Sequence, residues 1–225
     1  MKPDSLIRIH VPIKCPEDVI PHLGAAIHWK EGRSAKCLAD SWFAANAIPN
    51  SVADVLKGDA VFADARLIDA FLERGVRLQD GGRPSQTDLM AIVALKDKIG
   101  VLAIESKLDE TFGPTIAEWL TPTPSSGKLK RLELLGELLC IDPEPHGALR
   151  YQLLHRTASA VLEAKRYMSG EAAMVVQSFC PNISGFSDFS AFVSALGLGT
   201  AVVGGMTGAK VCGGVNLRLG WVAER

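Results

Sequence analysis

The chain has 225 residues, enough for one α/β domain that buries most of the surface of its unfolded form. Hydrophobic residues make up 48% and charged residues 22%, and no apolar run reaches the ~20 residues of a membrane span. The net charge of −1 counts against a dedicated DNA-binding module, which usually carries a basic excess. Arg8 and His10 interrupt any secretory segment, and five cysteines without a Cys-x-x-Cys pair suit reduced thiols. We therefore expect a cytoplasmic protein without a membrane partner.

The first 63 residues favour a helical extension. Pro16 followed by two acidic residues is typical of a helix start, and Ser34 is a candidate cap for a helix that runs to about residue 45. A further helix is predicted over residues 65–73, because its apolar residues recur at helical spacing, with Gly75 ending it.

A change of period after residue 75 indicates strands. Residues 76–78 predict a short strand of their own. Residues 89–95 and 99–104 are continuous apolar runs on either side of a charged turn. Their length and β-branched content favour two strands that are buried on both faces and joined as a hairpin.

Helices alternate with strands in the second half of the chain. The sequence predicts helices over 128–140, 149–168 and 186–196, a buried strand over 172–177 and a last strand ending near Trp221. From residue 65 to 177 the order is helix, strand, strand, strand, helix, strand, so the crossover predicts a parallel connection within a mixed central sheet. The expected architecture is one α/β domain over residues 1–225: an N-terminal helical extension (1–63), a core (64–180) and a C-terminal addition of a helix and a strand (181–225).

Three charged residues lie where the predicted hairpin opens. Strand side chains alternate between faces, so Glu105 and Lys107 point the same way. If the hairpin turns symmetrically about Asp97 and Lys98, Asp88 lies directly opposite Lys107. Asp88 and Glu105 then become diagonal neighbours on one face, roughly 7 Å apart. In this register two carboxylates and one ammonium group converge.

Two carboxylates beside a lysine have a chemical logic. Oxygen ligands with free coordination positions suit Mg²⁺ or Mn²⁺, which polarise a phosphoryl group and activate water. Lys107 can position that water or stabilise charge in the transition state. An acidic-x-Lys triplet is weak alone, since such charges also form surface ion pairs. A second triplet, Glu163-Ala164-Lys165, lies in the long predicted helix, where a solvated face is expected.

The element order resembles the core of the PD-(D/E)XK, or restriction-endonuclease-like, nuclease superfamily. Asp88 opens the second strand of this order, and Glu105-x-Lys107 ends the third. The resemblance implies hydrolysis of phosphodiester bonds in DNA or RNA with Mg²⁺ (or Mn²⁺), with Asp88 and Glu105 as metal ligands and Lys107 as the catalytic lysine. The proline of the motif name should directly precede the aspartate, whereas Thr87 stands there and Pro84 lies further back.

The resemblance extends to the helix after the motif. Exonuclease-like members carry a Gln followed three or four residues later by a Tyr; Gln152 matches the Gln, while His155 and Arg156 stand where the Tyr would be. Some members add a Glu from the helix before the first strand, for which Glu73 is the nearest candidate. The chain also resembles bacterial proteins that share segments such as Arg-Tyr-Gln-Leu-Leu-His-Arg-Thr, a resemblance that spans most of the chain and brings no activity. The expected site comprises catalytic Asp88, Glu105, Lys107 and Gln152, metal ligands Asp88, Glu105 and Glu73, and substrate-binding Gln86, Arg150, His155 and Arg156.

Several other residues keep two readings. Glu110 either reaches the site or helps to start a helix near Pro114. His155 and Arg156 lie one helical turn from Gln152 and suit phosphate contact, or else form a polar stripe on an amphipathic helix. The basic residues of two helices either form a track for a polyanion or are only solvated: Lys128, Lys130, Arg131, Arg150, Arg156, Lys165 and Arg166.

The sequence thus predicts a Mg²⁺-dependent nuclease acting on DNA, with RNA as the alternative substrate. The rival hypothesis is a catalytically inactive binding or assembly module of the same fold, which the near-neutral charge supports. A third hypothesis is a hydrolase of a small phosphorylated substrate. The glycine-rich residues 204–210 lack the spacing of a phosphate loop. The oligomeric state stays open, with a homodimer as one option.

Overall fold

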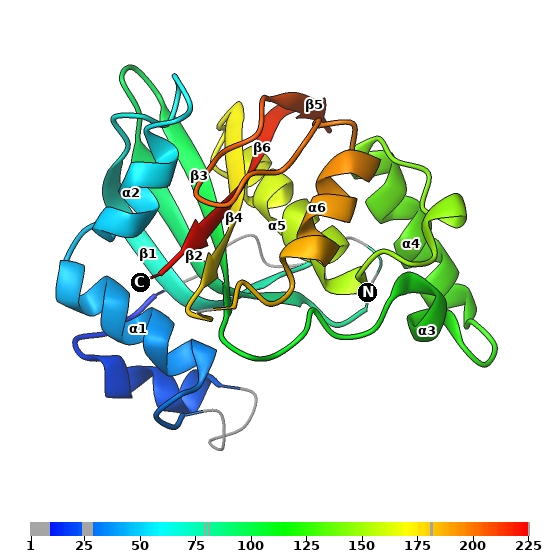
Figure 1. Cartoon of the computed structure of the whole chain (residues 1–225), viewed down its shortest axis with the longest axis horizontal. Coiled ribbons are helices and arrows are strands. Elements are labelled where there is room, and N and C mark those ends of the chain that lie inside the picture. The colour runs from blue at the N-terminus through cyan, green and yellow to red at the C-terminus, as the bar shows by residue number, and fades with distance from the viewer. Residues whose placement is uncertain (1–9, 24–28, 79, 81, 181, 225) are drawn as a thin grey trace.

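A central β-sheet with helices on both faces organises the protein, seen here in a computed structural model (Figure 1). The structure describes residues 10–23, 29–78, 80, 82–180 and 182–224. Within these residues six strands form one mixed sheet in the order β1-β2-β3-β4-β6-β5, so the expected α/β class is confirmed. The strands are β1 (Arg66–Val76), β2 (Ser85–Ala94), β3 (Ile99–Lys107), β4 (Glu171–Ser178), β5 (Lys210–Cys212) and β6 (Val215–Ala223). The helices are η1 (Pro16–His22), α1 (Ser34–Ala45), α2 (Asn50–Leu56), α3 (Ile116–Leu120), α4 (Ser126–Leu139), η3 (Glu144–His146), α5 (Tyr151–Arg166) and α6 (Phe186–Ala195).

The sheet joins an antiparallel half to a parallel half. β1, β2 and β3 pair antiparallel in sequence, β4 pairs parallel with both β3 and β6, and β5 is antiparallel to β6. The chain reaches β4 from β3 through α5, which confirms the predicted helical crossover between parallel strands. Because β6 pairs with β4 along its length, the C-terminal residues extend the same sheet.

Helices cover both faces of the sheet (Figure 1). α1 and α2 lie on one face, where Val52 and Ile104 belong to one apolar core. α4, α5 and α6 lie on the other face, where Leu154, Met174 and Phe192 belong to a second core. β3 and β4 are therefore buried on both sides, as their continuous apolar runs predict. No helix in the described part of the chain is both long and apolar enough to cross a bilayer.

The helix predicted over residues 65–73 is wrong, because these residues form most of β1. β1 is an edge strand that pairs with β2 from Arg66 to Val76. A register shift between Leu67 and Asp69 leaves Ile68 unpaired and 50% exposed. The helical spacing of the apolar residues misled the prediction, since long-range pairing decides the conformation of a half-exposed edge strand.

The predicted hairpin between β2 and β3 is confirmed, but its predicted register is wrong by two residues. Met90 lies opposite Ala103, and Ala94 lies opposite Ile99. The Leu95 amide donates to the Lys98 carbonyl at 2.8 Å, which closes a turn centred one residue earlier than expected. A shift of two residues keeps every side chain on its predicted face, so the grouping of the charged residues survives the error.

Ser34 begins α1 and does not cap it. The N-cap residue is Arg33, and its side chain makes no capping hydrogen bond. The Ser34 hydroxyl instead donates to Glu110 Oε1, which ties α1 to the loop after β3. The helix start predicted at Pro16 is a 3₁₀-helix, η1.

The prediction that Glu163 lies on a solvated helix face is also wrong. Glu163 is 2% exposed and accepts hydrogen bonds from Arg74 Nε at 3.0 Å and Nη2 at 2.7 Å. Arg74 lies on β1, most of which was predicted as a helix. Because that strand was missed, the pairing of Arg74 with Glu163 on α5 could not be predicted from the sequence. Lys165, the other charged member of the triplet, is exposed as expected.

Candidate active site

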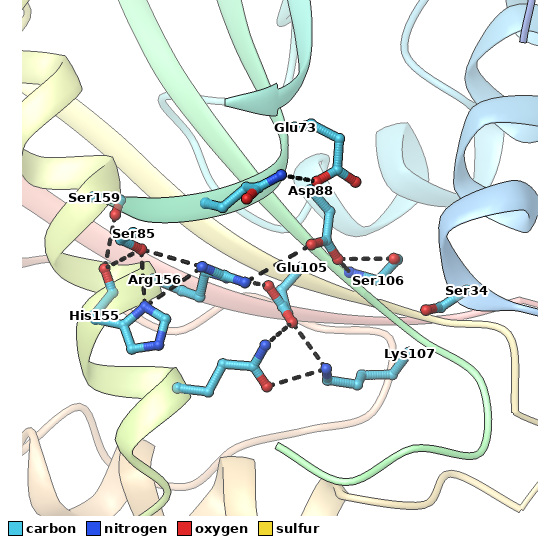
Figure 2. A network of polar contacts seen from close by, with 12 residues as sticks. Ser34, Glu73, Ser85, Asp88, Glu105, Ser106, Lys107, His155, Arg156 and Ser159 are labelled. Atoms are coloured by element: carbon cyan, nitrogen blue, oxygen red, sulfur yellow. Dashed lines mark hydrogen bonds and ion pairs between the residues drawn. The ribbon is translucent and has the colours of Figure 1, made fainter. Parts of the chain in front are cut away.

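Three carboxylates lie in a row across the antiparallel strands, where the hairpin opens. Continued by one residue from Leu89, the register sets Glu73 beside Asp88 and Asp88 beside Glu105, on β1, β2 and β3. Neighbouring strands lie about 4.8 Å apart, so the three side chains are close together. Lys107 follows at the end of β3 and reaches Glu105, as the alternation of strand side chains predicts (Figure 2).

Glu105 is the most completely bonded of the three. Its Oε1 accepts hydrogen bonds from Lys107 Nζ at 2.8 Å and Gln152 Nε2 at 2.6 Å, and its Oε2 accepts from Arg156 Nε at 2.5 Å. Gln152 Oε1 also accepts from Lys107 Nζ at 3.1 Å. Burial raises the pKa of Glu105, but Arg156 and Lys107 outweigh it and hold the pKa at about 2. Glu105 is therefore a permanent anion held between two cations.

Asp88 carries less compensation. Its Oδ2 accepts from the backbone amide and the hydroxyl of Ser106, both at 2.8 Å. Its Oδ1 lies 3.9 Å from Arg156 Nη2, beyond hydrogen-bond distance. Burial and the charge of Glu105 raise the pKa of Asp88 to about 6, although Arg156 and Lys107 act against them.

Glu73 completes the row from an unusual backbone conformation. Its φ is +52°, which few residues other than glycine adopt, and the strain is of the kind found at functional sites. Gln86 Nε2 donates to Glu73 Oε2 at 2.6 Å and to the carbonyl of His22 at 3.3 Å. Burial and the charge of Asp88 raise the pKa of Glu73 to about 7. The predicted residue thus reaches the site, but from a strand and not from a preceding helix.

Arg156 joins the carboxylates to a second polar cluster (Figure 2). Arg156 Nη1 donates to Ser85 Oγ at 3.2 Å, and Ser85 Oγ lies 2.8 Å from His155 Nδ1. Arg156 Nη1 also lies 3.5 Å from His155 Nδ1. Since a guanidinium only donates, the tautomer that suits this contact has Nδ1 as the acceptor and the ring hydrogen on Nε2. Burial and the neighbouring charge of Arg156 lower the pKa of His155 to about 3, so the imidazole is neutral.

A cleft of about 420 Å³ opens beside this network. Lys107, Gln152, His155 and Arg156 line it together with the segment that follows β3. Glu110 lies in that segment, so it reaches the cleft, where Ser34 and the amides of residues 108 and 109 hold its carboxylate. Burial raises the pKa of Glu110, but these hydrogen bonds outweigh it and the pKa is lowered.

The remaining predicted basic residues do not form a free basic track. Arg150 precedes α5 and donates to Asp188 at 2.9 Å and to the carbonyl of Gly113 at 2.8 Å, away from the carboxylate row. Arg131 is paired with Asp80. Among the basic residues of this set, the exposed cations are Lys130, Lys165 and Arg166.

The donor set fits a hard divalent cation only in part. Carboxylate oxygens are the ligands that Mg²⁺ and Mn²⁺ prefer. Burial first, and a neighbouring carboxylate second, raise the pKa values of Glu73 and Asp88, and a bound cation would stabilise their ionised forms. Both oxygens of Glu105, however, are engaged by protein donors. Within the described residues, no three Asp, Glu, His or Cys side chains are arranged to hold an ion. A cation at Glu105 therefore requires Arg156 to release it.

Two site residues escaped the sequence prediction. Ser85 anchors Arg156 and His155, and Ser106 binds Asp88 through both its amide and its hydroxyl. Ser106 is the central residue of the Glu105-x-Lys107 triplet, and strand alternation assigned it to the opposite face. Because both the amide and the hydroxyl of Ser106 donate to Asp88, alternation of side chains alone could not predict its contribution.

The chain belongs to the family described as Domain of unknown function (DUF6946), whose model matches residues 12–225. The carboxylate row, the cleft and all six strands lie inside the matched region. No curated protein and no solved structure matches this chain.

Proposed function

We propose that this protein is a metal-dependent phosphodiester hydrolase of the PD-(D/E)XK type that acts on DNA. The observation that carries the proposal is the convergence of Asp88, Glu105, Lys107 and Gln152 at the open end of one hairpin. The strand order also supports it, because an antiparallel hairpin passes through a helix into a parallel strand, as in the restriction-endonuclease-like core.

Asp88 and Glu105 would hold Mg²⁺ or Mn²⁺ after Arg156 releases Glu105, with Glu73 as the neighbouring carboxylate of the row. The cation would supply Lewis acidity at the phosphate and lower the pKa of a bound water. Lys107 contacts Glu105 and lines the cleft, where its ammonium group can orient water or stabilise charge on the phosphate. The pKa of Lys107 is raised, because Glu105 and Asp88 outweigh the effect of burial, so the amine stays protonated and acts as an electrostatic group, not as a base.

The residues of α5 have distinct tasks in this proposal. Gln152 holds Glu105 and Lys107 in one arrangement through both ends of its amide. His155 is neutral and offers Nε2–H, a donor for a phosphate oxygen in the cleft it lines. Gln86 positions Glu73 and does not face the cleft, which makes it a positioning residue.

A second candidate is a catalytically inactive module of the same fold. It is favoured by the saturation of Glu105, whose two oxygens already meet Lys107, Gln152 and Arg156. The pairing of Arg131 and Arg150 with protein carboxylates points the same way, because it leaves few free cations for a polyanion.

The test is a cleavage assay on linear, circular and single-stranded DNA, and on RNA, with Mg²⁺ or Mn²⁺. Asp88→Ala and Lys107→Ala are expected to reduce cleavage by about a thousandfold or more, since each removes charge stabilisation at the reacting phosphate. Asp109→Ala serves as the control, because this exposed carboxylate lies just beyond the motif.

Circular dichroism must first establish that each variant folds. Cleavage that survives both substitutions would overturn the assignment of the site. An intact protein that neither cleaves nor binds Mn²⁺ supports the inactive module.

A further inference from the structure

Arg156 lies between two carboxylates of the row. Its Nε donates to Glu105 Oε2 at 2.5 Å, and its Nη2 lies 3.9 Å from Asp88 Oδ1. The guanidinium is buried, with 11% of the side chain exposed, and faces two carboxylates of the row. It therefore provides there the positive charge that a metal ion would otherwise supply.

The guanidinium also has a second set of partners. Arg156 Nη1 donates to Ser85 Oγ at 3.2 Å and lies 3.5 Å from His155 Nδ1. These neutral groups bind Nη1 of the guanidinium, while Nε and Nη2 face the carboxylates of Glu105 and Asp88. Arg156 also lines the cleft, so its fork can exchange a carboxylate for a phosphate oxygen without leaving Ser85.

The charges of the site make such an exchange necessary. Glu73, Asp88 and Glu105 face two fixed cations, Lys107 and Arg156. A divalent cation added beside Arg156 would meet a like charge within a few ångströms, and it would also have to displace the hydrogen bond on Glu105. Release of Glu105 by Arg156 frees a ligand, and a phosphate bound to the guanidinium would offset that repulsion.

We propose that Arg156 is an internal counter-ion that competes with the divalent cation for Glu105 and Asp88 and yields its place when a substrate phosphate binds the guanidinium. The inference rests on the proposed function, because it assigns a regulatory step to the same site. Metal and DNA then bind cooperatively, since each favours the arrangement in which Arg156 has left Glu105.

The first experiment measures Mn²⁺ affinity by calorimetry in the full chain without DNA. Arg156→Gln is expected to bind Mn²⁺ about tenfold more tightly than the wild type, because one unit of opposing charge has gone. Arg156→Lys is expected to show an intermediate affinity, since a shorter ammonium group cannot meet both carboxylates. Arg150→Gln is the matched control, because it also removes one positive charge near the start of α5. Arg150 contacts Asp188 and not the carboxylate row, so the Mn²⁺ affinity of this variant should equal that of the wild type.

The second experiment measures the effect of DNA on the same affinity. Lys107→Ala is the background, chosen to suppress cleavage during titration with a short DNA duplex. DNA is expected to tighten Mn²⁺ binding in this variant by a larger factor than in the double variant with Arg156→Gln, because the double variant has no counter-ion to release.

The outcomes separate the two proposals. Equal or weaker Mn²⁺ binding by Arg156→Gln overturns the counter-ion and leaves the metal-dependent function standing. If Arg156→Gln does not fold, Arg156→Lys decides, and affinity no tighter than the wild type overturns the inference. Absence of Mn²⁺ binding from the wild type and from every folded variant removes the proposed function and the inference together.

Discussion

Two buried ion networks lie at opposite ends of β3 and β4, and they differ in charge balance. At the start of these strands, Glu171 accepts hydrogen bonds from Lys98 Nζ at 2.7 Å, Arg218 Nη1 at 2.7 Å and Asn216 Nδ2 at 3.1 Å. Arg218 Nε also donates to Asp59 at 2.6 Å. Two carboxylates therefore meet two cations, and the pKa of Glu171 is lowered, because hydrogen bonds from Lys98 and Arg218 outweigh the effect of burial.

In the network at the other end of these strands, carboxylates outnumber the cations that they meet. Among the described residues, Glu73, Asp88 and Glu105 meet two cations, Lys107 and Arg156, and the pKa values of two of the three carboxyl groups are raised. The first network joins elements of the fold, and its carboxylates are matched by its cations, so it needs no further ligand. The second has, within the part of the chain that the structure describes, one more carboxylate than cations and borders a cleft, which is the pattern expected of a binding site.

The largest effect on stability is expected in the balanced network. Arg218→Ala should lower the free energy of unfolding by about 3–5 kcal/mol, because it leaves the buried Glu171 and the partly buried Asp59 without their shared partner. Urea unfolding measures this change. Lys57→Ala is the control, since its exposed pair with Asp54 should contribute less than about 1 kcal/mol. A loss as small as that of the control would mean that the balanced network is not what holds these elements together.

A substitution in the unbalanced network should act in the opposite direction. Asp88→Asn is expected to stabilise the metal-free protein by about 1–2 kcal/mol at pH 7, because it removes an anion whose pKa is raised and keeps an acceptor for Ser106. Asp97→Asn, in the exposed hairpin turn, should change stability by less than about 0.5 kcal/mol. Destabilisation by Asp88→Asn would show that the protein already balances the charge of the Asp88 carboxylate.

The advantage of Asp88→Asn should depend on pH. The pKa of Asp88 rises from 3.8 to about 6 on folding, so the folded state binds the proton more tightly. Below pH 3.8 the carboxyl is protonated in both states and imposes no penalty; above pH 6 it is ionised in both, and the penalty is complete. The difference between variant and wild type should therefore grow from near zero at pH 4 to its full value near pH 7. Thermal unfolding in a metal-free pH series measures it, and a pH-independent difference would contradict the prediction.

The smallest effect is expected at the rim of the balanced network. The Lys98 side chain is 47% exposed, so Lys98→Ala should lower the free energy of unfolding by no more than about 1 kcal/mol, although it binds the same carboxylate as Arg218. The comparison by urea unfolding tests whether burial decides the contribution of each cation. Similar losses for both substitutions would contradict that view.

The sequence predicted the central elements well where apolar runs were long and continuous. β3, β4 and α5 are buried strongly enough that their patterns reveal both the element and its faces. The same reasoning placed Gln152, His155 and Arg156 on one predicted helix, and the structure brings Gln152 and Arg156 to Glu105. The prediction failed for β1, because the apolar residues of a half-exposed edge strand do not alternate clearly with a period of two.

The sequence alone determined that Asp88, Glu105 and Lys107 share one face of the hairpin. A strand alternates its side chains whatever lies around it, and for this reason Asp88, Glu105 and Lys107 met even though the predicted register was wrong by two residues. Only the tertiary structure decided which charges are neighbours. The turn at Leu95–Lys98 set Asp88 opposite Glu105, and the packing of α5 on the sheet brought Arg156 between them. Ion pairs between distant segments depend on how those segments pack, and residue spacing along one segment does not encode that packing.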